Sequence, residues 1–120
     1  MVLFDTNAIL RYILHDNLEM AEEVKKQLFN NFCYIPVEVV AEVVYVLSKV
    51  YKVERKTISQ IIMDMTNADK IRVLHSNVVQ HALGVFAAST LDFVDCLLVG
   101  YAKEKQYSVF TFDKRLQKYL

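Results

Sequence analysis

The chain has 120 residues, 54% of them hydrophobic, which is enough for one compact domain with a substantial core and too few for a second domain. Its 14 basic and 14 acidic residues give a formal net charge of zero, so any nucleic-acid or membrane partner must be bound by a local patch. No apolar run reaches the ~18 residues that span a bilayer, and Cys33 and Cys96 form neither a CxxC pair nor a disulfide framework, so we expect a cytoplasmic protein with a single domain over residues 1–120.

The first third of the chain alternates between strand and helix patterns. Residues 2–4 are a short apolar segment typical of a buried strand, and the apolar spacing that follows predicts a helix beginning near Thr6. Another helix is expected over residues 18–29. The letters "FCYIP" predict a second strand that ends at Pro36, because the fixed φ and missing N–H of proline suit the first turn of a following helix.

The segment "VEVVAEVVYVLSKV" is rich in valine but too long for a single strand. Its polar residues lie on one helical stripe, so we predict a helix. The members of this stripe are Glu38, Glu42, Tyr45 and Lys49. The remaining predicted elements are helices over 56–66, 78–88 and 91–106, a third strand at "IRVL", and a fourth strand followed by a short helix in "YSVFTFDKRL".

Strands that alternate with helices pair in parallel through right-handed crossovers. The sequence therefore predicts an α/β fold, namely a three-layer α/β/α domain with a short, mostly parallel central sheet of about four strands. In such sheets the ligand crevice lies outside the carboxyl ends of the strands. Asp5 follows the first strand and Asp113 the fourth, while Glu42 and Asp95 lie in the first two turns of their helices. Four carboxylates are expected to converge.

Each carboxylate also has a purely structural interpretation. Asp5 and Asp113 are placed to cap helices by accepting hydrogen bonds from free N–H groups. Asp92 and Asp95 have the spacing of a capping-box pair, with Asp92 as the N-cap residue. Glu42 can belong simply to the solvated stripe. The combination of the four acids, rather than any one of them, favours a functional site.

Carboxylate clusters bind Mg²⁺ and Mn²⁺, which prefer oxygen ligands. One or two such ions allow phosphodiester cleavage without a histidine or serine nucleophile, and the three histidines show no metal-ligand spacing. Thr6, Asn7 and Thr111 are candidates for orienting the ligands or binding a phosphate. Their alternative role is local turn and capping chemistry.

Three segments, "FDTNAIL", "IPVEVVAEVVYVL" and "DFVDCLLVGYAKEKQYSVFTFDKRL", together resemble the PIN-domain ribonucleases, and specifically the VapC-type toxins of bacterial and archaeal toxin–antitoxin pairs. The resemblance covers nearly the whole chain. It implies that the acidic, metal-binding set of the family falls on Asp5, Glu42, Asp95 and Asp113, with Asp5 and Asp95 matching the firmest metal ligands. Thr111 matches the small hydroxyl residue in the "TFD" motif.

The resemblance further implies an endoribonuclease that depends on one or two Mg²⁺ or Mn²⁺ ions and acts as the toxin of a type II toxin–antitoxin system, inhibiting translation. Its expected partners are RNA, a cognate antitoxin and a second copy in a homodimer. Asn7 matches the polar residue beside the first acid. Lys114 and Arg115 are the basic residues nearest the site. The other candidates for holding RNA phosphates are Arg11, Lys103, Lys105 and Lys118. Each can instead be an ordinary solvated helix residue, which is the favoured interpretation for Lys103 and Lys105.

Two interpretations with the same fold remain open: an RNA-processing nuclease outside a toxin–antitoxin pair, and a non-catalytic module that binds RNA or protein. A haloacid-dehalogenase-like phosphatase also places an acid after its first strand. Its nucleophile motif is Asp-x-Asp, however, and Asn7 stands where the second acid is required. Metal-dependent cleavage distinguishes the nucleases from the binding module.

Overall fold

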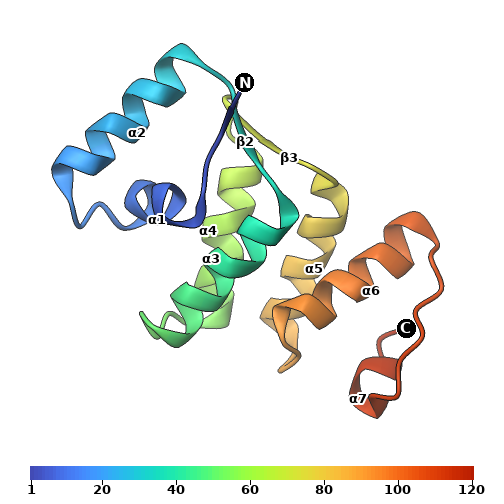
Figure 1. Ribbon diagram of the computed structural model, residues 1–120. Helices are drawn as coiled ribbons and strands as arrows, with labels where there is room; N and C mark the ends of the chain where they lie inside the picture. The colour runs from blue at the N-terminus through green and yellow to red at the C-terminus, as the bar shows by residue number, and fades with distance from the viewer.

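The computed structural model describes residues 1–120, and its elements follow the predicted alternation of strands and helices (Figure 1). The strands are β1 (Val2–Leu3), β2 (Cys33–Ile35) and β3 (Ile71–Val73). The helices are α1 (Thr6–Leu14), α2 (Leu18–Asn30), α3 (Val37–Lys49), α4 (Arg55–Thr66), α5 (Ser76–Ala88), α6 (Phe93–Lys105) and α7 (Lys114–Gln117).

The three strands form one parallel sheet in the order β1-β2-β3. Helices α1 and α2 connect the first pair of strands, and α3 and α4 connect the second, as parallel pairing requires. Val2 N–H donates to the carbonyl of Phe32 at 2.8 Å, and Phe4 N–H donates to that of Tyr34 at 3.2 Å. The α/β class, with helices packed around a short parallel sheet, is confirmed.

The valine-rich segment is a helix, as its length and polar stripe predicted. In α3 the buried residues are Val40, Val43, Val44 and Leu47, which have the i, i+3, i+4, i+7 spacing of one helical face. All four belong to a single core of 25 buried residues drawn from strands and helices throughout the chain. A strand would instead have buried alternate residues.

The predicted fourth strand is absent, so the sheet has three strands and not about four. Residues 106–113 form no helix or strand, and Phe110 and Phe112 are 88% and 87% exposed. The physical reason lies in α6, which packs against α5 and leads the chain away from the sheet (Figure 1). Residues 107–112 therefore have no neighbouring strand with which to form hydrogen bonds. The short helix predicted after this segment is present as α7.

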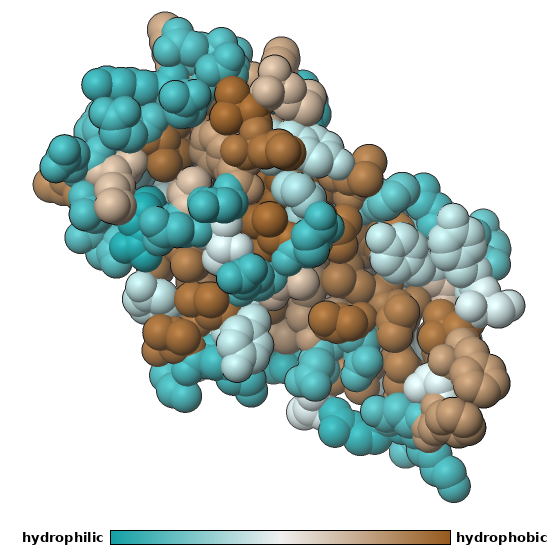
Figure 2. Space-filling model, in the orientation of Figure 1, coloured by the Kyte–Doolittle hydropathy of each residue, from teal (hydrophilic) through white to brown (hydrophobic).

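The molecule is elongated, with extents of 46 × 29 × 18 Å. Its radius of gyration is 14.8 Å, whereas a compact domain of this length has about 13.6 Å. Figure 2 shows apolar side chains gathered across the middle of one face and over the C-terminal end. None of the helices has the length and apolar character needed to cross a membrane.

Candidate active site

Asp5 lies directly after β1 and caps α1. Its backbone is extended, and its Oδ1 accepts a hydrogen bond from the Ala8 N–H at 2.9 Å. The capping role expected from its position is therefore confirmed. Capping uses one oxygen, and the other carboxylate oxygen of this exposed side chain accepts no hydrogen bond from the protein. A capping aspartate can thus still offer an oxygen to a cation.

Asp113 occupies the same position at the start of α7. Its Oδ1 accepts hydrogen bonds from the N–H groups of Arg115 at 2.8 Å and Leu116 at 3.2 Å. Thr111 Oγ1 accepts from the Asp113 N–H at 3.0 Å, which places the hydroxyl in the turn that leads into the helix. The local interpretation of Thr111 and the capping role of Asp113 are both confirmed, and one carboxylate oxygen of Asp113 remains free.

Asp95 lies half-buried in the first turn of α6. Burial raises the pKa of its carboxyl above the ordinary value, and the nearby charges of Asp113 and Asp92 raise it further, against a smaller opposing effect of Arg115. Arg115 is itself anchored, since its Nη2 donates to Thr90 Oγ1 at 2.8 Å. Asp95 therefore feels the charges of two other acids and of one arginine at the start of α6.

Asp92 is the N-cap residue of α6 by position, but its side chain makes no capping hydrogen bond. The capping-box interpretation of Asp92 and Asp95 is therefore wrong. Both carboxylates instead border a cleft of about 530 Å³ between α3 and the start of α6. Tyr45 and Lys49 line the opposite wall. Glu42 lies three residues before Tyr45 on the same helical stripe, which places it next to this cleft.

The sequence assigned Tyr45 and Lys49 only to a solvated stripe, and it gave no role to Arg55. Arg55 lines the same cleft, with its guanidinium 3.7 Å from the centre of the Phe86 ring. Its Nε donates to the carbonyl of Phe86 at 2.8 Å, and its Nη2 donates to that of Leu91. These bonds fix the connection between α5 and α6. Because the acceptors are backbone groups distant in sequence, no local pattern could have revealed them.

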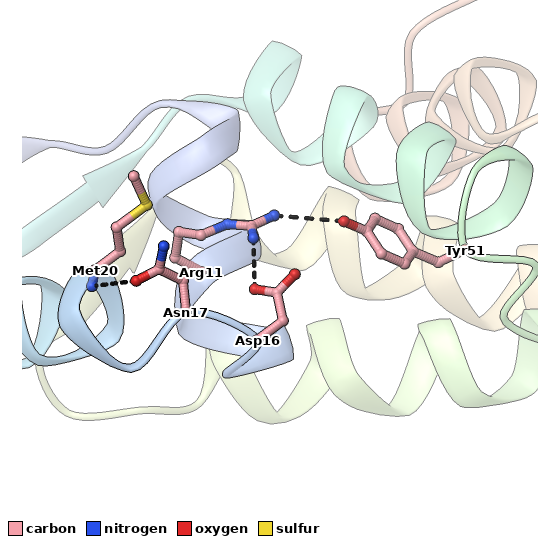
Figure 3. Close-up of polar contacts among 5 residues, drawn as sticks. All are labelled: Arg11, Asp16, Asn17, Met20 and Tyr51. Atoms are coloured by element: carbon pink, nitrogen blue, oxygen red, sulfur yellow. Dashed lines mark hydrogen bonds and ion pairs between the residues drawn. The ribbon is translucent and has the colours of Figure 1, made fainter.

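Arg11, one of the basic residues considered for RNA binding, is occupied by contacts within the protein. Its guanidinium donates to Asp16 and, at 3.5 Å, to the hydroxyl of Tyr51, which ties α1 to the turn after α3 (Figure 3). In the same region Asn17 caps α2 by accepting from the Met20 N–H at 3.0 Å (Figure 3). The side chains of other candidate residues make no hydrogen bond within the protein. These are Thr6, Asn7, Lys105, Lys114 and Lys118, whereas Lys103 donates to the carbonyl of Leu120 at 3.2 Å.

The structure thus separates the four predicted acids into two places. Asp95 and Asp113 lie close enough to repel each other at the start of α6. Asp5 lines a different groove, between β1 and α2, together with Glu23. No three acidic, histidine or cysteine side chains lie close enough together to hold a metal ion.

Residues 2–119 match the PIN domain family. The chain belongs to the PIN-domain family. It is also similar to a VapC ribonuclease of Aquifex aeolicus (strain VF5), with 27% identity over 123 residues that cover 98% of this chain and 91% of the relative. The recognition made from the sequence motifs is therefore confirmed at the level of the family, and the α/β architecture is that of a PIN domain.

The donor set of this PIN domain fits a hard divalent cation. Carboxylate oxygens are the ligands that such ions prefer, and the caps at Asp5 and Asp113 leave one oxygen of each available. A cation beside Asp95 would also favour its charged form, against the burial and the neighbouring acids that raise its pKa. The fit is one of ligand chemistry, and it requires the Asp5 side of the protein to come together with the Asp95 side.

Proposed function

We propose that this PIN domain is a metal-dependent endoribonuclease that acts as the toxin of a type II toxin–antitoxin system and inhibits translation. The observation that carries the proposal is the cleft between α3 and α6, because it combines acids on one wall with an aromatic ring and a lysine on the other. The similarity to a VapC ribonuclease favours RNA as the substrate. Its further partner is a cognate antitoxin.

The acidic residues Asp5, Glu42, Asp95 and Asp113 are proposed to hold one or two Mg²⁺ or Mn²⁺ ions. When bound, these ions supply an activated water and stabilise the leaving oxygen of the phosphodiester. The chain itself positions the RNA. The exposed ring of Tyr45 offers a stacking surface for an unpaired base.

Basic residues on both sides of the acids are proposed to receive the phosphates. Lys49 lines the cleft, and Lys114 begins α7 directly after Asp113. Both provide mobile point charges suited to a phosphate backbone. Arg115 is proposed to hold α7 against the start of α6 through its bond to Thr90, which keeps Asp113 beside Asp95. Thr6 and Asn7 lie next to Asp5 and are proposed to orient its carboxylate or a phosphate.

Cleavage of total cellular RNA and of a labelled single strand by the purified protein tests the enzymatic part. We expect cleavage with Mn²⁺ or Mg²⁺, none with chelator, and a loss of at least about 100-fold in Asp95→Asn, in which the shape is kept and a ligand charge is lost. Glu104→Gln is the matched control on the same helix. Metal-dependent binding of RNA without cleavage would instead identify a binding module.

Controlled expression tests the toxin part. Wild type should stop incorporation of labelled amino acids and growth, whereas Asp95→Asn, expressed at the same level, should not. Mapping the RNA ends that accumulate identifies the substrate. Cleavage by the purified protein without any effect on translation would assign the domain to RNA processing outside a toxin–antitoxin pair.

A further inference from the structure

Residues 107–112 belong to no sheet, and β1 is an edge strand whose outer side pairs with no other strand. We propose that this segment of one copy adds as a strand to β1 of a second copy, so that each active site joins Asp5 of one copy with Asp95 and Asp113 of the other. The strand addition stands by itself. The shared site rests on the nuclease function proposed above.

The outer edge of β1 is open in the sheet order β1-β2-β3. Val2 and Phe4 direct their N–H groups to β2, so the backbone groups of Leu3 between them face the open side. The side chain of Leu3 is 69% exposed. An uncovered edge of this kind recruits an extended segment through main-chain hydrogen bonds.

The segment that would occupy this edge forms no helix or strand, and its one paired backbone group is the Thr111 carbonyl, which accepts from Gln117 Nε2 at 2.9 Å. None of the amide groups from Ser108 to Phe112 donates a hydrogen bond within the chain. Tyr107 anchors its beginning by stacking on Tyr101 of α6, with ring centroids 6.1 Å apart. Phe110 and Phe112 project on one side with their rings in edge contact at 5.2 Å and are almost fully exposed. Backbone groups and apolar rings are both available to a partner.

The segment cannot reach its own β1 while α6 keeps its place. An added Cβ at Gly100 would lie 2.6 Å from the carbonyl oxygen of Val78, which shows how closely α6 is fitted against α5. Helix α6 has 13 residues and therefore extends about 20 Å, and it leads away from the sheet in Figure 1. Pairing within one chain would require α6 to run in another direction.

A second copy supplies a partner both for the open edge of β1 and for residues 107–112. Every copy carries one open edge and one unpaired segment, so a two-fold arrangement satisfies two edges reciprocally and leaves no further edge of this kind. Parallel addition aligns the carboxyl ends of the strands, which brings Asp113 of one copy to Asp5 of the other. Asp95 follows, because it already lies near Asp113 of its own chain.

Cross-linking between copies tests the strand addition without reference to activity. The native thiols should not react with a maleimide, because burial raises the pKa of both Cys33 and Cys96 to about 11 and so disfavours the reactive thiolate. Leu3→Cys and Thr111→Cys are co-expressed on separate chains of different mass and treated with a short bis-maleimide. We expect a covalent heterodimer containing one chain of each kind. Leu18→Cys, exposed on α2, replaces Leu3→Cys in the control and should give none.

Absence of the heterodimer overturns the proposal. Cross-linking only within a chain that carries both Leu3→Cys and Thr111→Cys would show that the segment returns to its own sheet, which also overturns it. Cross-linking of Thr111→Cys to Arg72→Cys, but not to Leu3→Cys, would place the segment on the β3 edge and overturn the shared site.

Complementation tests the shared site. Asp5→Asn and Asp113→Asn chains with different affinity tags are co-expressed, and heterodimers are isolated through both tags. One site of such a heterodimer carries both substitutions and the other carries none, so we expect about half the wild-type cleavage rate from two inactive parents.

An inactive heterodimer, beside an active wild type, would show that each site lies within one chain. If wild type itself does not cleave RNA, the proposed function and the shared site both fail, whereas the cross-link still decides the strand addition. The two failures are therefore distinguishable.

Discussion

Gly100 allows α5 and α6 to approach more closely than any other residue type would permit. Because an added Cβ would meet the Val78 carbonyl at 2.6 Å, Gly100→Ala should lower the free energy of unfolding by about 1–3 kcal/mol. Gly84→Ala is the matched change, since it lies in a helix with nothing within 4 Å of the new Cβ. It should raise stability by about 0.5–1 kcal/mol. Urea unfolding of both variants measures the difference.

If Gly100→Ala were as stable as wild type, the contact between Gly100 and Val78 would not be what fixes α6 against α5. The explanation given for the unpaired segment after α6 would then fail.

Cys33 is a second residue whose environment has a measurable consequence. Burial in β2 raises the pKa of its thiol from 9.0 to about 11. Between these values the unfolded thiol loses its proton while the native thiol keeps it, so the native state binds more protons and stability falls as pH rises. The slope from this one thiol is at most about 1.4 kcal/mol per pH unit. Urea unfolding from pH 8 to pH 10.5 should therefore show a shallower decline for Cys33→Ala than for wild type. Parallel declines would contradict the assignment.

At the scale of elements, Asp113 combines two roles that a pair of substitutions can separate. Asparagine keeps the capping oxygen and removes the charge, whereas alanine removes both. Asp113→Asn should abolish RNA cleavage while keeping α7, and Asp113→Ala should in addition lose about 0.5–2 kcal/mol of stability. Thermal unfolding at neutral pH compares the two variants. Equal stability would mean that the bonds to Arg115 and Leu116 do not hold the helix.

The helices were predictable because each depends on a pattern within its own segment. The valine-rich stretch became α3 because its buried residues repeat at helical spacing, and Pro36 marked its start. The prediction of a fourth strand at residues 107–112 was wrong. Alternating apolar residues indicate which side chains share a face, but they do not indicate whether a neighbouring strand is present. That neighbour depends on the direction of α6, which is set by contacts such as that between Gly100 and Val78.

In the candidate site, too, local features could be predicted from the sequence and features that depend on packing could not. Capping at Asp5 and Asp113 is local and followed from position alone. The approach of Asp95 to Asp113 and the cleft beside Tyr45 depend on how α3, α6 and α7 pack, which short motifs do not encode. Convergence of all four acids remains a prediction.

At the scale of the molecule, the open edge of β1 should control assembly. Leu3→Lys places a charge on the edge, which opposes strand addition. We expect this variant to sediment as a monomer at concentrations where wild type is a dimer. Leu18→Lys is the control, because Leu18 is 76% exposed on α2, away from the edge. A dimeric Leu3→Lys variant, or an equal effect of both substitutions, would place the interface elsewhere.

Phe110 and Phe112 are exposed in a single copy and lie in the segment proposed to pair with a second copy. This pairing makes enzyme activity depend on the number of chains in the cell. When a catalytic centre needs two copies, the amount of working enzyme at low abundance rises with the square of the number of chains present, by mass action. A few molecules made by leaky transcription then remain almost inert, and a tenfold burst of synthesis yields roughly a hundredfold more RNA cleavage. Dilution by cell growth reverses the effect just as steeply.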